Sequence, residues 1–469
     1  MFYNCSKLVY NDEQKNAIDN IINFISNDTN FFGLYGFAGT GKTTIIMEIV
    51  KYLLVENNFK NIAITAPTNK AVNILKSKIE ISQDFWDIYN LKFLTIHKLL
   101  GYVNDFSDEG SKIFTRGTKS TMGKYKLIVI DECSMIPKDM LDLIFNEVKR
   151  MRKKPKIFFV GDPAQLPPVN EINSKIFTYE TKFQTIILKQ IVRNTFIEVN
   201  DLWTSIRNWV EHNIALSKIK KGEHVFVFKS TLKKIDSDWF KIFLNEINAG
   251  KSSIILTWTN KQTDLYNFVI RKKIFKTKEQ YIINDLLILN NFYKDEEKKL
   301  YTSEQVKVIA VEIVYKRFNF IIENLPEYIV KILENIKNKT KMVYNIWKLK
   351  VKKIENNKIY EICVIHESSK KILEEDKSIS YKMIIEVIKT KKMFRDGKIL
   401  WKCWNDTFID NFAEVNYGFS ITTHKSQGST FGDVFVDVND ILTNSNENDA
   451  KRCLYTAITR ASGKIFLLI

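Results

Sequence analysis

Five short segments of this chain contain residue types that can bind a phosphate group and support phosphoryl transfer. The first is GFAGTGKT, from Gly36 to Thr43, which satisfies the pattern G-x-x-x-x-G-K-[ST]. It follows an apolar run typical of a strand and precedes a run typical of a helix, which is the context this motif requires. The sequence therefore predicts a phosphate-binding loop that opens a helix.

The residue types in this loop explain its chemistry. Glycine lets backbone N–H groups turn toward a phosphate without a Cβ clash, and the following helix directs its positive end at the same anion. We expect Lys42 to place a charge on the β- and γ-phosphates and the Thr43 hydroxyl to ligate Mg²⁺. The predicted nucleotide-binding residues of the loop are Gly36, Gly39, Thr40, Gly41, Lys42, Thr43 and Thr44.

Two adjacent carboxylates form the second segment. Asp131 and Glu132 follow four apolar residues in IVIDECSM, residues 128–135. We expect Asp131 to hold Mg²⁺, directly or through water, and Glu132 to polarise the attacking water. A carboxylate at a strand end is more often a helix cap when it stands alone, but two together in a chain with Lys42 and Thr43 favour metal and base.

The remaining candidates complete a hydrolytic site. Gln165, in FVGDPAQLPPV, can contact both the γ-phosphate and the attacking water. Phosphoryl transfer also needs cations near the charge that develops in the transition state. Arg193 in LKQIVRN and Arg460 in LYTAITRA are the best candidates, and we expect both to come from a second α/β unit that closes on the first. Taken alone, each arginine is more often a surface residue.

The elements that position these residues follow from the hydrophobic pattern. Short apolar runs alternate with amphipathic stretches up to residue 180, which predicts a mostly parallel sheet covered on both faces. Ligands then gather at the carboxyl ends of the strands. The expected strands lie at 31–36, 61–67, 126–132 and 156–162, and the expected helices at 44–56 and 138–151.

The rest of the chain predicts further units. A second α/β unit is expected to begin near residue 181 and to resume at 416–469, on either side of a β-rich insertion at 280–410. Residues 101–124 are too long for a tight connection and predict a small β-hairpin.

Length and composition bound the class of protein. A chain of 469 residues suggests two to four domains, and a net charge of +17 favours a polyanionic partner. Its abundant Lys, Ile and Asn make charge alone a weak argument. The chain has no apolar stretch near the roughly 20 residues of a membrane span, and its start lacks a signal-peptide pattern. Five widely spaced cysteines predict ordinary thiols in a reducing interior compartment.

The motif set resembles a known family. In chain order it comprises GFAGTGKTT, ITAPTNKAVNIL, TIHKLLG, IVIDECSM, FVGDPAQLPPV, LKQIVRN, ITTHKSQGSTF and YTAITRA. This set is very specific and resembles superfamily 1 helicases of the 5′-to-3′ branch, the RecD/Pif group, with the greatest similarity to the phage Dda type. The similarity covers nearly the whole chain, although the long Pif signature before the GD motif is not evident.

The resemblance implies a fold and several roles. It implies two RecA-like P-loop domains, 1–180 and 181–279 with 411–469, with a β-hairpin pin at 101–124 in the first and a small β-barrel at 280–410 in the second. ATP and Mg²⁺ are the implied cofactors. Gln14 matches the adenine-reading position, Gly428 a position near the γ-phosphate, and Arg193 and Arg460 the arginine fingers.

The resemblance also implies contacts with a DNA strand. Small hydroxyls and backbone amides suit phosphate contacts, which position a strand without reading its sequence. In the pin, Phe106 or Phe114 would stack on the last base pair, and packing within the hairpin is the equally open alternative. The predicted DNA-contacting residues are Pro67, Thr68, Asn69, His97, Phe106, Phe114, Thr259, Asn260, Thr423, His424 and Lys425.

The expected function is therefore that of an ATP-dependent DNA helicase. We expect a monomer that moves 5′ to 3′ on single-stranded DNA, unwinds duplex at single/double-strand junctions and acts in replication, recombination or repair, with replication proteins among its partners. Cytoplasm or another intracellular DNA-containing compartment is expected, without a membrane. A P-loop switch or small-molecule kinase would not need FVGDPAQLPPV or ITTHKSQGS. A non-catalytic nucleic-acid-binding or packaging protein would not need Asp131 and Glu132.

Overall fold

The chain folds into two compact units. The computed structural model describes residues 8–79, 83–168, 170–214, 219, 221–231, 233–295, 298–391 and 394–469. The first unit contains residues 1–102, 118–275 and 419–469, and the second contains residues 103–117 and 276–418. Each unit thus combines segments that are far apart in the sequence.

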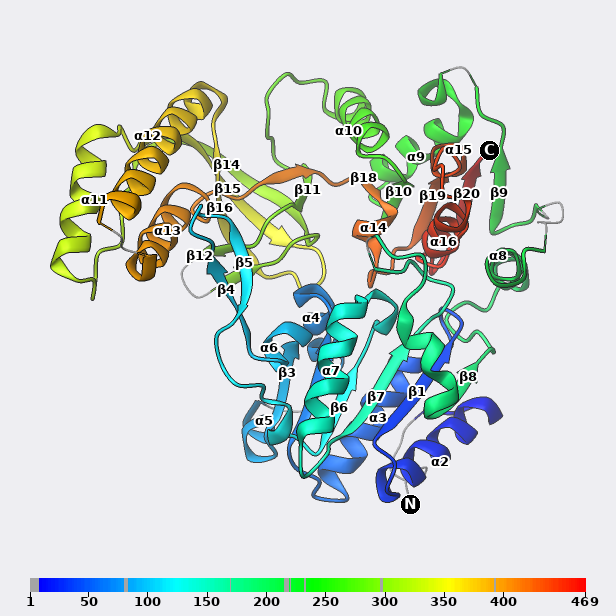
Figure 1. The fold of residues 1–469 in the computed structure, drawn as a ribbon. Helices are drawn as coiled ribbons and strands as arrows, with labels where there is room; N and C mark the ends of the chain where they lie inside the picture. Colours follow the sequence, from blue (N-terminus) through cyan, green and yellow to red (C-terminus); the bar gives the residue numbers. More distant parts are fainter. Residues whose placement is uncertain are drawn as a thin grey trace. The chain divides into compact units, whose positions relative to one another are not determined.

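A six-stranded parallel sheet organises the first part of the first unit (Figure 1). Its order is β3-β2-β6-β7-β1-β8, and every neighbouring pair is parallel. The strands are β1 (Phe31–Gly36), β2 (Ile62–Ala66), β3 (Leu91–Thr95), β6 (Leu127–Ile130), β7 (Lys156–Gly161) and β8 (Gln184–Leu188). The helices are α2 (Asp12–Ser26), α3 (Lys42–Val55), α4 (Asn69–Lys78), α5 (Gln83–Ile88), α6 (Ile96–Leu99) and α7 (Lys138–Arg150).

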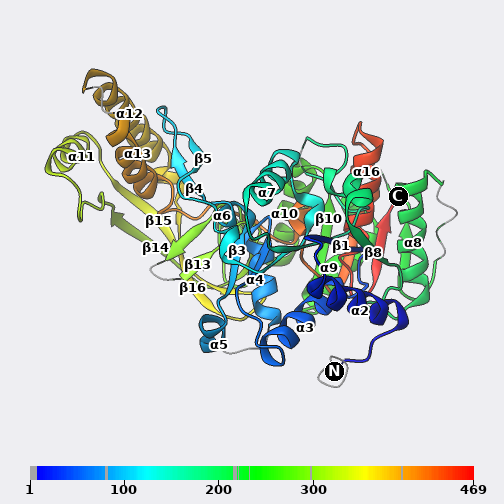
Figure 2. The same cartoon turned by 60° about the horizontal axis from the view of Figure 1, so that its bottom comes forward.

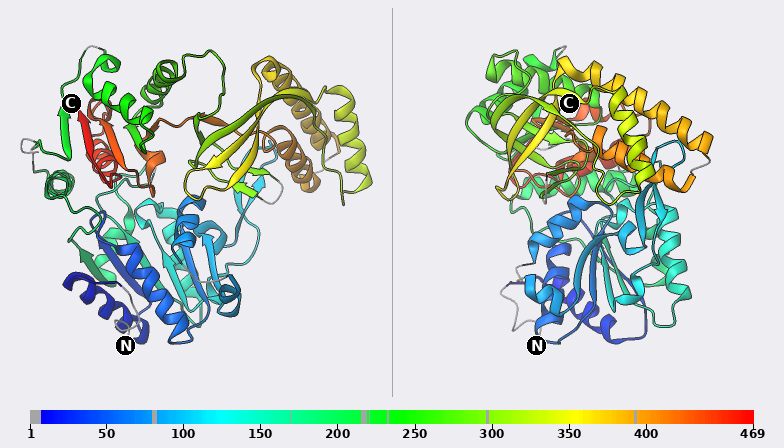
Figure 3. Two further views of the ribbon diagram at one scale, coloured as in Figure 1. Left: turned by 180° about the vertical axis from the view of Figure 1, so that it is seen from behind. Right: turned by 90° about the vertical axis from the view of Figure 1, so that its left-hand side faces the viewer.

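Helices cover both faces of this sheet (Figure 3). Because successive strand residues point to opposite faces, Val129 and Phe158 join a core cluster with α2, α3 and α4. Their neighbours Ile128 and Phe159 join a second cluster with α6 and α7. The expected α/β architecture, with a parallel sheet buried on both faces, is confirmed.

The expected start of a second α/β unit near residue 181 is wrong. Residues Gln184–Leu188 form β8, the edge strand of the first sheet, which pairs in parallel with β1. The two strands approach closely at Gly36, where a Cβ atom would lie only 2.3 Å from the carbonyl oxygen of Leu188. An apolar run specifies a strand but not its partner, so the sequence of this segment fits either sheet.

A second parallel sheet completes the first unit. Its order is β18-β10-β19-β20-β9, again with every neighbouring pair parallel. The strands are β9 (Val225–Phe228), β10 (Ser253–Thr257), β18 (Ser420–Thr422), β19 (Asp433–Asp437) and β20 (Ile465–Leu468). The helices are α8 (Ile197–His212), α9 (Asp238–Asn248), α10 (Asn260–Phe275), α14 (Thr423–Ser426), α15 (Val438–Ile441) and α16 (Glu447–Ile458).

An antiparallel sheet and three helices form most of the second unit. The sheet order is β16-β15-β14-β11-β17. Its strands are β11 (Leu286–Leu289), β14 (Gln305–Arg317), β15 (Val343–Lys353), β16 (Ile359–Ile365) and β17 (Val415–Tyr417), and a separate pair consists of β12 (Tyr293–Asp295) and β13 (Lys298–Leu300). The helices are α11 (Glu327–Lys339), α12 (Glu367–Lys391) and α13 (Phe394–Phe408).

The antiparallel sheet extends beyond the expected insertion. The segment 415–417, expected in the second α/β domain, pairs instead with β11 of this sheet. Among the described strands the order runs from β16 to β17 without a pairing that joins these two, so closure into a barrel stays a prediction.

The predicted hairpin is present and belongs to the second unit. Strands β4 (Tyr102–Phe106) and β5 (Lys112–Arg116) form a two-stranded sheet beside α12 and α13 (Figure 2). The indole N–H of Trp401 donates to the carbonyl of Asp108 at 3.2 Å. Lys112 forms an ion pair with Asp410 at 2.9 Å. The hairpin was expected as part of the first domain. These contacts instead join it to residues much later in the chain: Lys112 and Asp410 are 298 positions apart.

Two further observations concern the cysteines and the length of the apolar helices in the described part of the chain. Among the described residues, Cys133, Cys363, Cys403 and Cys453 form no disulfide and are buried, and Cys5 lies outside the described part of the chain. Burial raises the pKa of the Cys133 thiol well above its usual value. No helix in the described ranges combines the length and apolar character that a membrane crossing demands.

Candidate nucleotide and strand site

The glycine-rich loop connects β1 to α3, as predicted. Gly41 caps α3 in the left-handed region, with φ of 85°, a conformation that favours glycine. The ammonium of Lys42 donates to the carbonyls of Gly36 and Phe37 at 2.8 and 2.7 Å. Burial lowers the pKa of Lys42, and the negative charge of Asp162 opposes this shift. The loop thus holds a desolvated cation at the start of a helix.

Gln14 lies against this loop. Its backbone N–H and side-chain oxygen form a capping box with Asn11 at the start of α2. Its amide nitrogen donates to the carbonyl of Thr40 at 3.0 Å, which fixes the side chain beside the loop. Thr40 is fully buried and donates to the carbonyl of Phe37, whereas Thr44 is exposed on the first turn of α3. Adenine recognition by Gln14 stays a prediction.

The two carboxylates follow β6 directly and lie beside the loop. The hydroxyl of Thr43 donates to Oδ2 of Asp131 at 3.0 Å, and the N–H of Glu132 donates to Oδ1 of Asp131 at 2.9 Å. Glu132 has φ of 52°, a left-handed conformation that costs free energy for a residue other than glycine. Burial raises the pKa of both carboxyls, and the charge of Asp131 raises that of Glu132 further.

Gln165 lies in the turn after β7 and is buried, with 7% of its surface exposed. Its backbone N–H donates to the carbonyl of Asp162 at 3.2 Å. Within the described residues its side-chain oxygen Oε1 has no hydrogen-bond partner. Buried polar atoms are normally paired, so this acceptor is available for a ligand or a water molecule.

Arg193 comes from a different part of the fold than expected. It follows β8 of the first sheet, so it does not come from the second α/β part of the unit. The backbone N–H groups of Val192 and Arg193 both donate to the carbonyl of Gly39 at 2.9 Å. The guanidinium donates to the carbonyl of Thr459 at 3.3 Å. Burial, together with the smaller effect of the positive charge of Arg460, lowers the pKa of Arg193 to about 10.

Arg460 follows α16 of the second sheet and is 3% exposed. Its Nε donates to the carbonyl of Thr456 at 3.0 Å and its Nη1 to that of Ser429 at 3.4 Å. Burial lowers its pKa, and the charge of Glu132 opposes this shift most strongly. Gly428, one residue before Ser429, has φ of 73°. The second sheet therefore brings a buried arginine toward the catalytic carboxylate predicted on the first.

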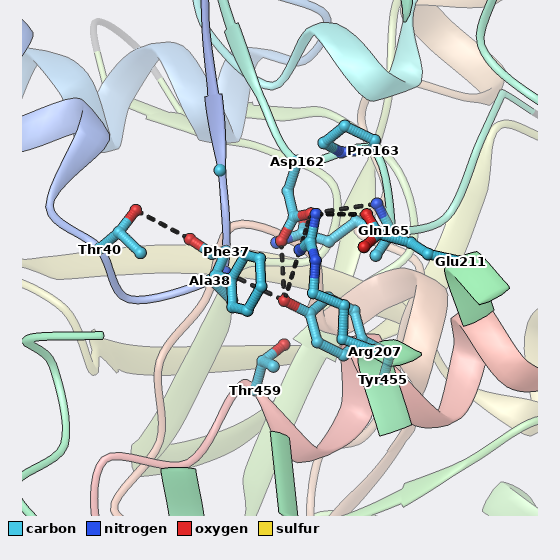
Figure 4. Close-up of polar contacts among 12 residues, drawn as sticks. Phe37, Ala38, Thr40, Asp162, Pro163, Gln165, Arg207, Glu211, Tyr455 and Thr459 are labelled. Carbon is cyan, nitrogen blue, oxygen red and sulfur yellow. Dashed lines mark hydrogen bonds and ion pairs between the residues drawn. The ribbon is translucent and has the colours of Figure 1, made fainter. Parts of the chain in front are cut away.

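A buried ionic network beside these groups was not predicted (Figure 4). Asp162 forms an ion pair with Arg207 at 2.6 Å and accepts a hydrogen bond from Tyr455 at 3.0 Å. Asp162 and Tyr455 stand inside the motifs FVGDPAQLPPV and LYTAITRA, so their positions were a usable signal. Arg207 stands inside an ordinary helix pattern, which contains no such signal.

The first sheet brings together two groups of residues that were predicted to contact DNA. In the register of β2 and β3, Ala66 pairs with Thr95, so the turn at Pro67 and the start of α6 at Ile96 lie at the same edge. Thr68 is exposed and caps α4 by accepting from the N–H of Ala71 at 3.2 Å, and Asn69 is exposed beside it. His97 is half-buried in α6, and burial lowers its pKa.

The second sheet brings together the remaining residues that were predicted to contact DNA, and the prediction for Thr423 needs correction. Thr257 of β10 pairs with Thr422 of β18, so the residues after both strands share one edge. Thr423 is fully buried and donates to the carbonyl of Thr257 at 3.1 Å; the expectation that its side chain contacts DNA is wrong. Thr259 donates to Asp440 at 2.8 Å, and Asn260 is exposed at the start of α10.

The neighbouring residues of α14 remain accessible. His424 is exposed, and its ring lies 5.1 Å from that of Trp258. Lys425 is half-buried, and burial lowers its pKa. These side chains lie at the same edge as Asn260.

The two hairpin phenylalanines have different surroundings. Phe106 is 8% exposed and packs in a core cluster with Phe318, Tyr344 and Trp401 of the second unit. Its ring is therefore not available to a base, and the packing alternative holds, although its partners lie outside the hairpin. Phe114 is 58% exposed.

The fold and site define the class of P-loop nucleoside triphosphatases with two parallel sheets. Residues 17–171 match the AAA domain family, and residues 417–468 match the UvrD-like helicase C-terminal domain family. An uncharacterized protein of Acanthamoeba polyphaga mimivirus is 35% identical, over 98% of this chain and 100% of that protein.

Two named relatives also span nearly the whole chain. The RecBCD enzyme subunit RecD of Buchnera aphidicola is 30% identical over 96% of this chain and 72% of that protein. The ATP-dependent DNA helicase dda of Enterobacteria phage T4 is 23% identical over 97% of this chain and 98% of that protein. The chain belongs to the superfamily 1 helicases of the RecD/Pif type.

Proposed function

We propose that this protein is an ATP-dependent DNA helicase that moves along single-stranded DNA from 5′ to 3′ and separates duplex DNA. One observation carries the proposal. Arg193, beside the phosphate-binding loop, donates to the carbonyl of Thr459 at 3.3 Å. The next residue, Arg460, is buried after α16 of the second sheet, and the charge of Glu132 after β6 of the first sheet opposes the lowering of its pKa by burial. A cation supplied by one sheet to a nucleotide held by the other couples hydrolysis to relative motion of the two sheets.

The nucleotide is ATP, held by the loop and α3, with Gln14 directed at adenine. The hydroxyl of Thr43 and the carboxylate of Asp131, whose oxygens lie 3.0 Å apart, are the oxygen ligands that Mg²⁺ prefers. These two residues would hold the ion, which when bound neutralises charge on the β- and γ-phosphates.

The other residues act on the γ-phosphate and the attacking water. Glu132 accepts a proton from the water, and the free oxygen of Gln165 orients the water and contacts the γ-phosphate. Arg193 and Arg460 stabilise the charge that develops on the phosphoryl oxygens. Gly428, in the left-handed region, keeps the turn after α14 open to the same phosphate.

The DNA strand follows the carboxyl ends of β2 and β3 in the first sheet and of β10 and β18 in the second. The candidate contacts at these edges are Pro67, Thr68, Asn69, His97, Thr259, Asn260, His424 and Lys425. Most of these residues have polar or basic side chains, which suit contacts with phosphate and sugar. Contacts of this kind carry no sequence information, as a translocating motor requires. The net charge of +17 adds a general attraction for the strand.

The hairpin β4–β5 acts as the pin at the single/double-strand junction, with Phe114 as its exposed aromatic residue. The antiparallel sheet of 276–418 is the barrel-like insertion of the second RecA-like domain. The protein works as a monomer in an intracellular DNA-containing compartment, in replication, recombination or repair, together with replication proteins.

The decisive experiment combines two measurements on the purified full chain. ATP hydrolysis is measured with and without single-stranded DNA, and unwinding is measured on duplexes with a 5′ tail or a 3′ tail. We expect strong stimulation by DNA and unwinding of the 5′-tailed substrate alone. Preference for the 3′ tail would overturn the polarity.

The competing functions predict other results. Hydrolysis that is indifferent to DNA would favour a P-loop switch or kinase, and DNA binding without any hydrolysis would favour a non-catalytic binding protein. Lys42→Ala serves as the matched inactive control, because it removes one ammonium from the loop and leaves the residues predicted to contact DNA unchanged.

A further inference from the structure

Three buried side chains from distant parts of the chain meet at one point (Figure 4). Arg207 of α8 is 1% exposed, and its Nη1 donates to Oδ1 of Asp162 at 2.6 Å and to the hydroxyl of Tyr455 at 3.0 Å. The Tyr455 hydroxyl in turn donates to Oδ2 of Asp162 at 3.0 Å. The three groups form a closed triangle of hydrogen bonds.

The triangle extends to the phosphate-binding loop. The backbone N–H of Ala38 donates to the Tyr455 hydroxyl at 3.1 Å. The guanidinium carbon of Arg207 lies 4.0 Å from the centroid of the Phe37 ring, within the range of a cation–π interaction. The Tyr455 hydroxyl therefore uses its one proton and two lone pairs on the turn after β7, the loop and α8.

The same elements carry the groups proposed to act on the γ-phosphate. Asp162 precedes Gln165 by three positions, and Tyr455 precedes Arg460 by five. On α16, Nη1 of Arg452 also donates to the carbonyls of Pro163 and, at 3.2 Å, Gln165. Helix α16 thus holds the turn that carries Gln165 while it leads to Arg460.

The charges of this network depend on one another. Burial alone would raise the pKa of Asp162, but Arg207 and Lys42 reverse the shift and lower it. Burial alone would lower the pKa of Arg207, but Asp162 reverses that shift and raises it. A buried pair of this kind is stable only when both partners are present. Removal of either partner would therefore leave the other as a buried charge without its main partner.

A purely structural role accounts for part of these contacts but not for all of them. A pair that only stabilises the fold needs no partner in the loop, whereas Tyr455 binds a backbone N–H inside it. Tyr455 also lies on the helix that ends next to the proposed arginine finger. These connections join the loop, the turn of Gln165 and the helix of Arg460 through one hydroxyl group.

We propose that Tyr455, Asp162 and Arg207 are positioning residues for ATP hydrolysis, which align Arg460 and Gln165 with the phosphate-binding loop. The inference rests on the proposed function. Tyr455 is the central member because its hydroxyl contacts both other residues and the loop. The residues contact no reacting atom; they act through the geometry of Arg460 and Gln165.

Tyr455→Phe tests the inference because it removes one oxygen and keeps the ring. Misplacement of catalytic groups by about 1 Å can cost about 100-fold in rate. We expect kcat of the DNA-stimulated ATPase to fall by roughly 10- to 100-fold. We expect KM for ATP and DNA affinity to stay close to the wild-type values, because the loop and the predicted strand contacts remain.

Tyr344→Phe is the matched control. Tyr344 is 1% exposed and donates to Oδ2 of Asp376 at 2.7 Å, so the variant breaks an equally buried tyrosine–aspartate bond in the second unit. Its ATPase should equal that of the wild type. Arg207→Lys provides a second test, since it keeps the charge but not the fork that binds Asp162 and Tyr455 together. It should lower kcat, and Arg207→Met should lower it further.

Different outcomes would contradict the proposed function and the positioning role of Tyr455, Asp162 and Arg207. A wild-type protein without DNA-stimulated hydrolysis would overturn the proposed function and this inference with it. An active wild type with unchanged kcat in folded Tyr455→Phe would overturn the inference alone. A raised KM with unchanged kcat would also overturn it, because that result indicates a role in ATP binding. If Tyr455→Phe does not fold, equal kcat values for Arg207→Lys and the wild type would overturn the inference.

Discussion

The hydroxyl of Thr43 and the carboxylate of Asp131 lie 3.0 Å apart, although 88 positions separate the two residues in the chain. Thr43 lies in the first turn of α3, after β1, and Asp131 follows β6, so the parallel sheet brings both to its carboxyl edge. Each residue was predicted as a magnesium ligand from its own motif. Their contact is the arrangement that a shared ion would require.

Lys42→Ala should abolish ATP turnover and leave binding of single-stranded DNA largely intact. The ammonium lies inside the loop, where it donates to the carbonyls of Gly36 and Phe37, and it belongs to none of the predicted strand contacts. Steady-state ATPase and fluorescence anisotropy with labelled DNA measure the two properties. Near wild-type hydrolysis would show that the loop does not hold the reacting phosphates.

Glu132→Gln should retain ATP binding but hydrolyse ATP about 10²- to 10⁴-fold more slowly, because an amide does not accept a proton from water. The measurement is single-turnover hydrolysis beside nucleotide binding by the same variant. Asp131→Asn is the neighbouring control and should weaken magnesium-dependent nucleotide binding as well. Loss of ATP binding in Glu132→Gln would instead indicate a metal ligand or a structural residue.

Arg460→Gln should lower kcat far more than it lowers the affinity for ATP. The guanidinium is buried and held by the carbonyls of Thr456 and Ser429, and the charge of Glu132 opposes the lowering of its pKa by burial, so we expect it to act on the transition state. Arginine fingers contribute roughly 10³- to 10⁵-fold, which is an upper guide when Arg193 shares the task. Equal losses in ATP binding and turnover would contradict transition-state stabilisation.

Phe106→Ala and Phe114→Ala should separate stability from unwinding. Phe106 is buried among core residues of the second unit, so its removal should cost about 3–5 kcal/mol in unfolding free energy. Phe114 is 58% exposed, so its removal should leave stability nearly unchanged and slow unwinding while DNA-stimulated ATPase continues. Thermal unfolding and a forked-duplex assay measure both variants. Wild-type unwinding by Phe114→Ala would exclude this ring as a wedge.

Asp162→Asn should destabilise the protein by an amount that depends on pH. The folded-state pKa of Asp162 lies below its ordinary value because Arg207 and Lys42 outweigh the effect of burial. Such a carboxylate contributes stability that is fully present above the unfolded pKa, about 4, and is lost as pH falls through the folded value. At pH 7 the variant should lose up to about 3–5 kcal/mol, because Arg207 stays buried without its main partner.

Chemical denaturation of wild type and variant between pH 7 and pH 3 tests this dependence. The difference in unfolding free energy should narrow below about pH 4, where Asp162 of the unfolded wild type gains a proton before Asp162 of the folded protein does. A difference that stays constant over this range would show that the charge of Asp162 is not the source of its contribution.

The sequence by itself determined the class of chemistry. The glycine pattern, the adjacent Lys42 and Thr43, and the paired Asp131 and Glu132 each depend on a few neighbouring residues and on a strand before them. Strand, turn and helix start are local properties of the chain. In a parallel sheet all strand ends meet at one edge, so the proximity of these motifs followed from the fold class alone.

Only the tertiary structure decided which segments are partners. The run that forms β8 fits the edge of either parallel sheet by its composition, and its pairing with β1 places Arg193 on the first sheet. Phe106 and Thr423 were candidates for DNA contact, but residues from distant segments bury their side chains. Arg207 joins Asp162 and Tyr455 because three separate elements pack together, and packing between distant segments depends on the whole core, which no local pattern encodes.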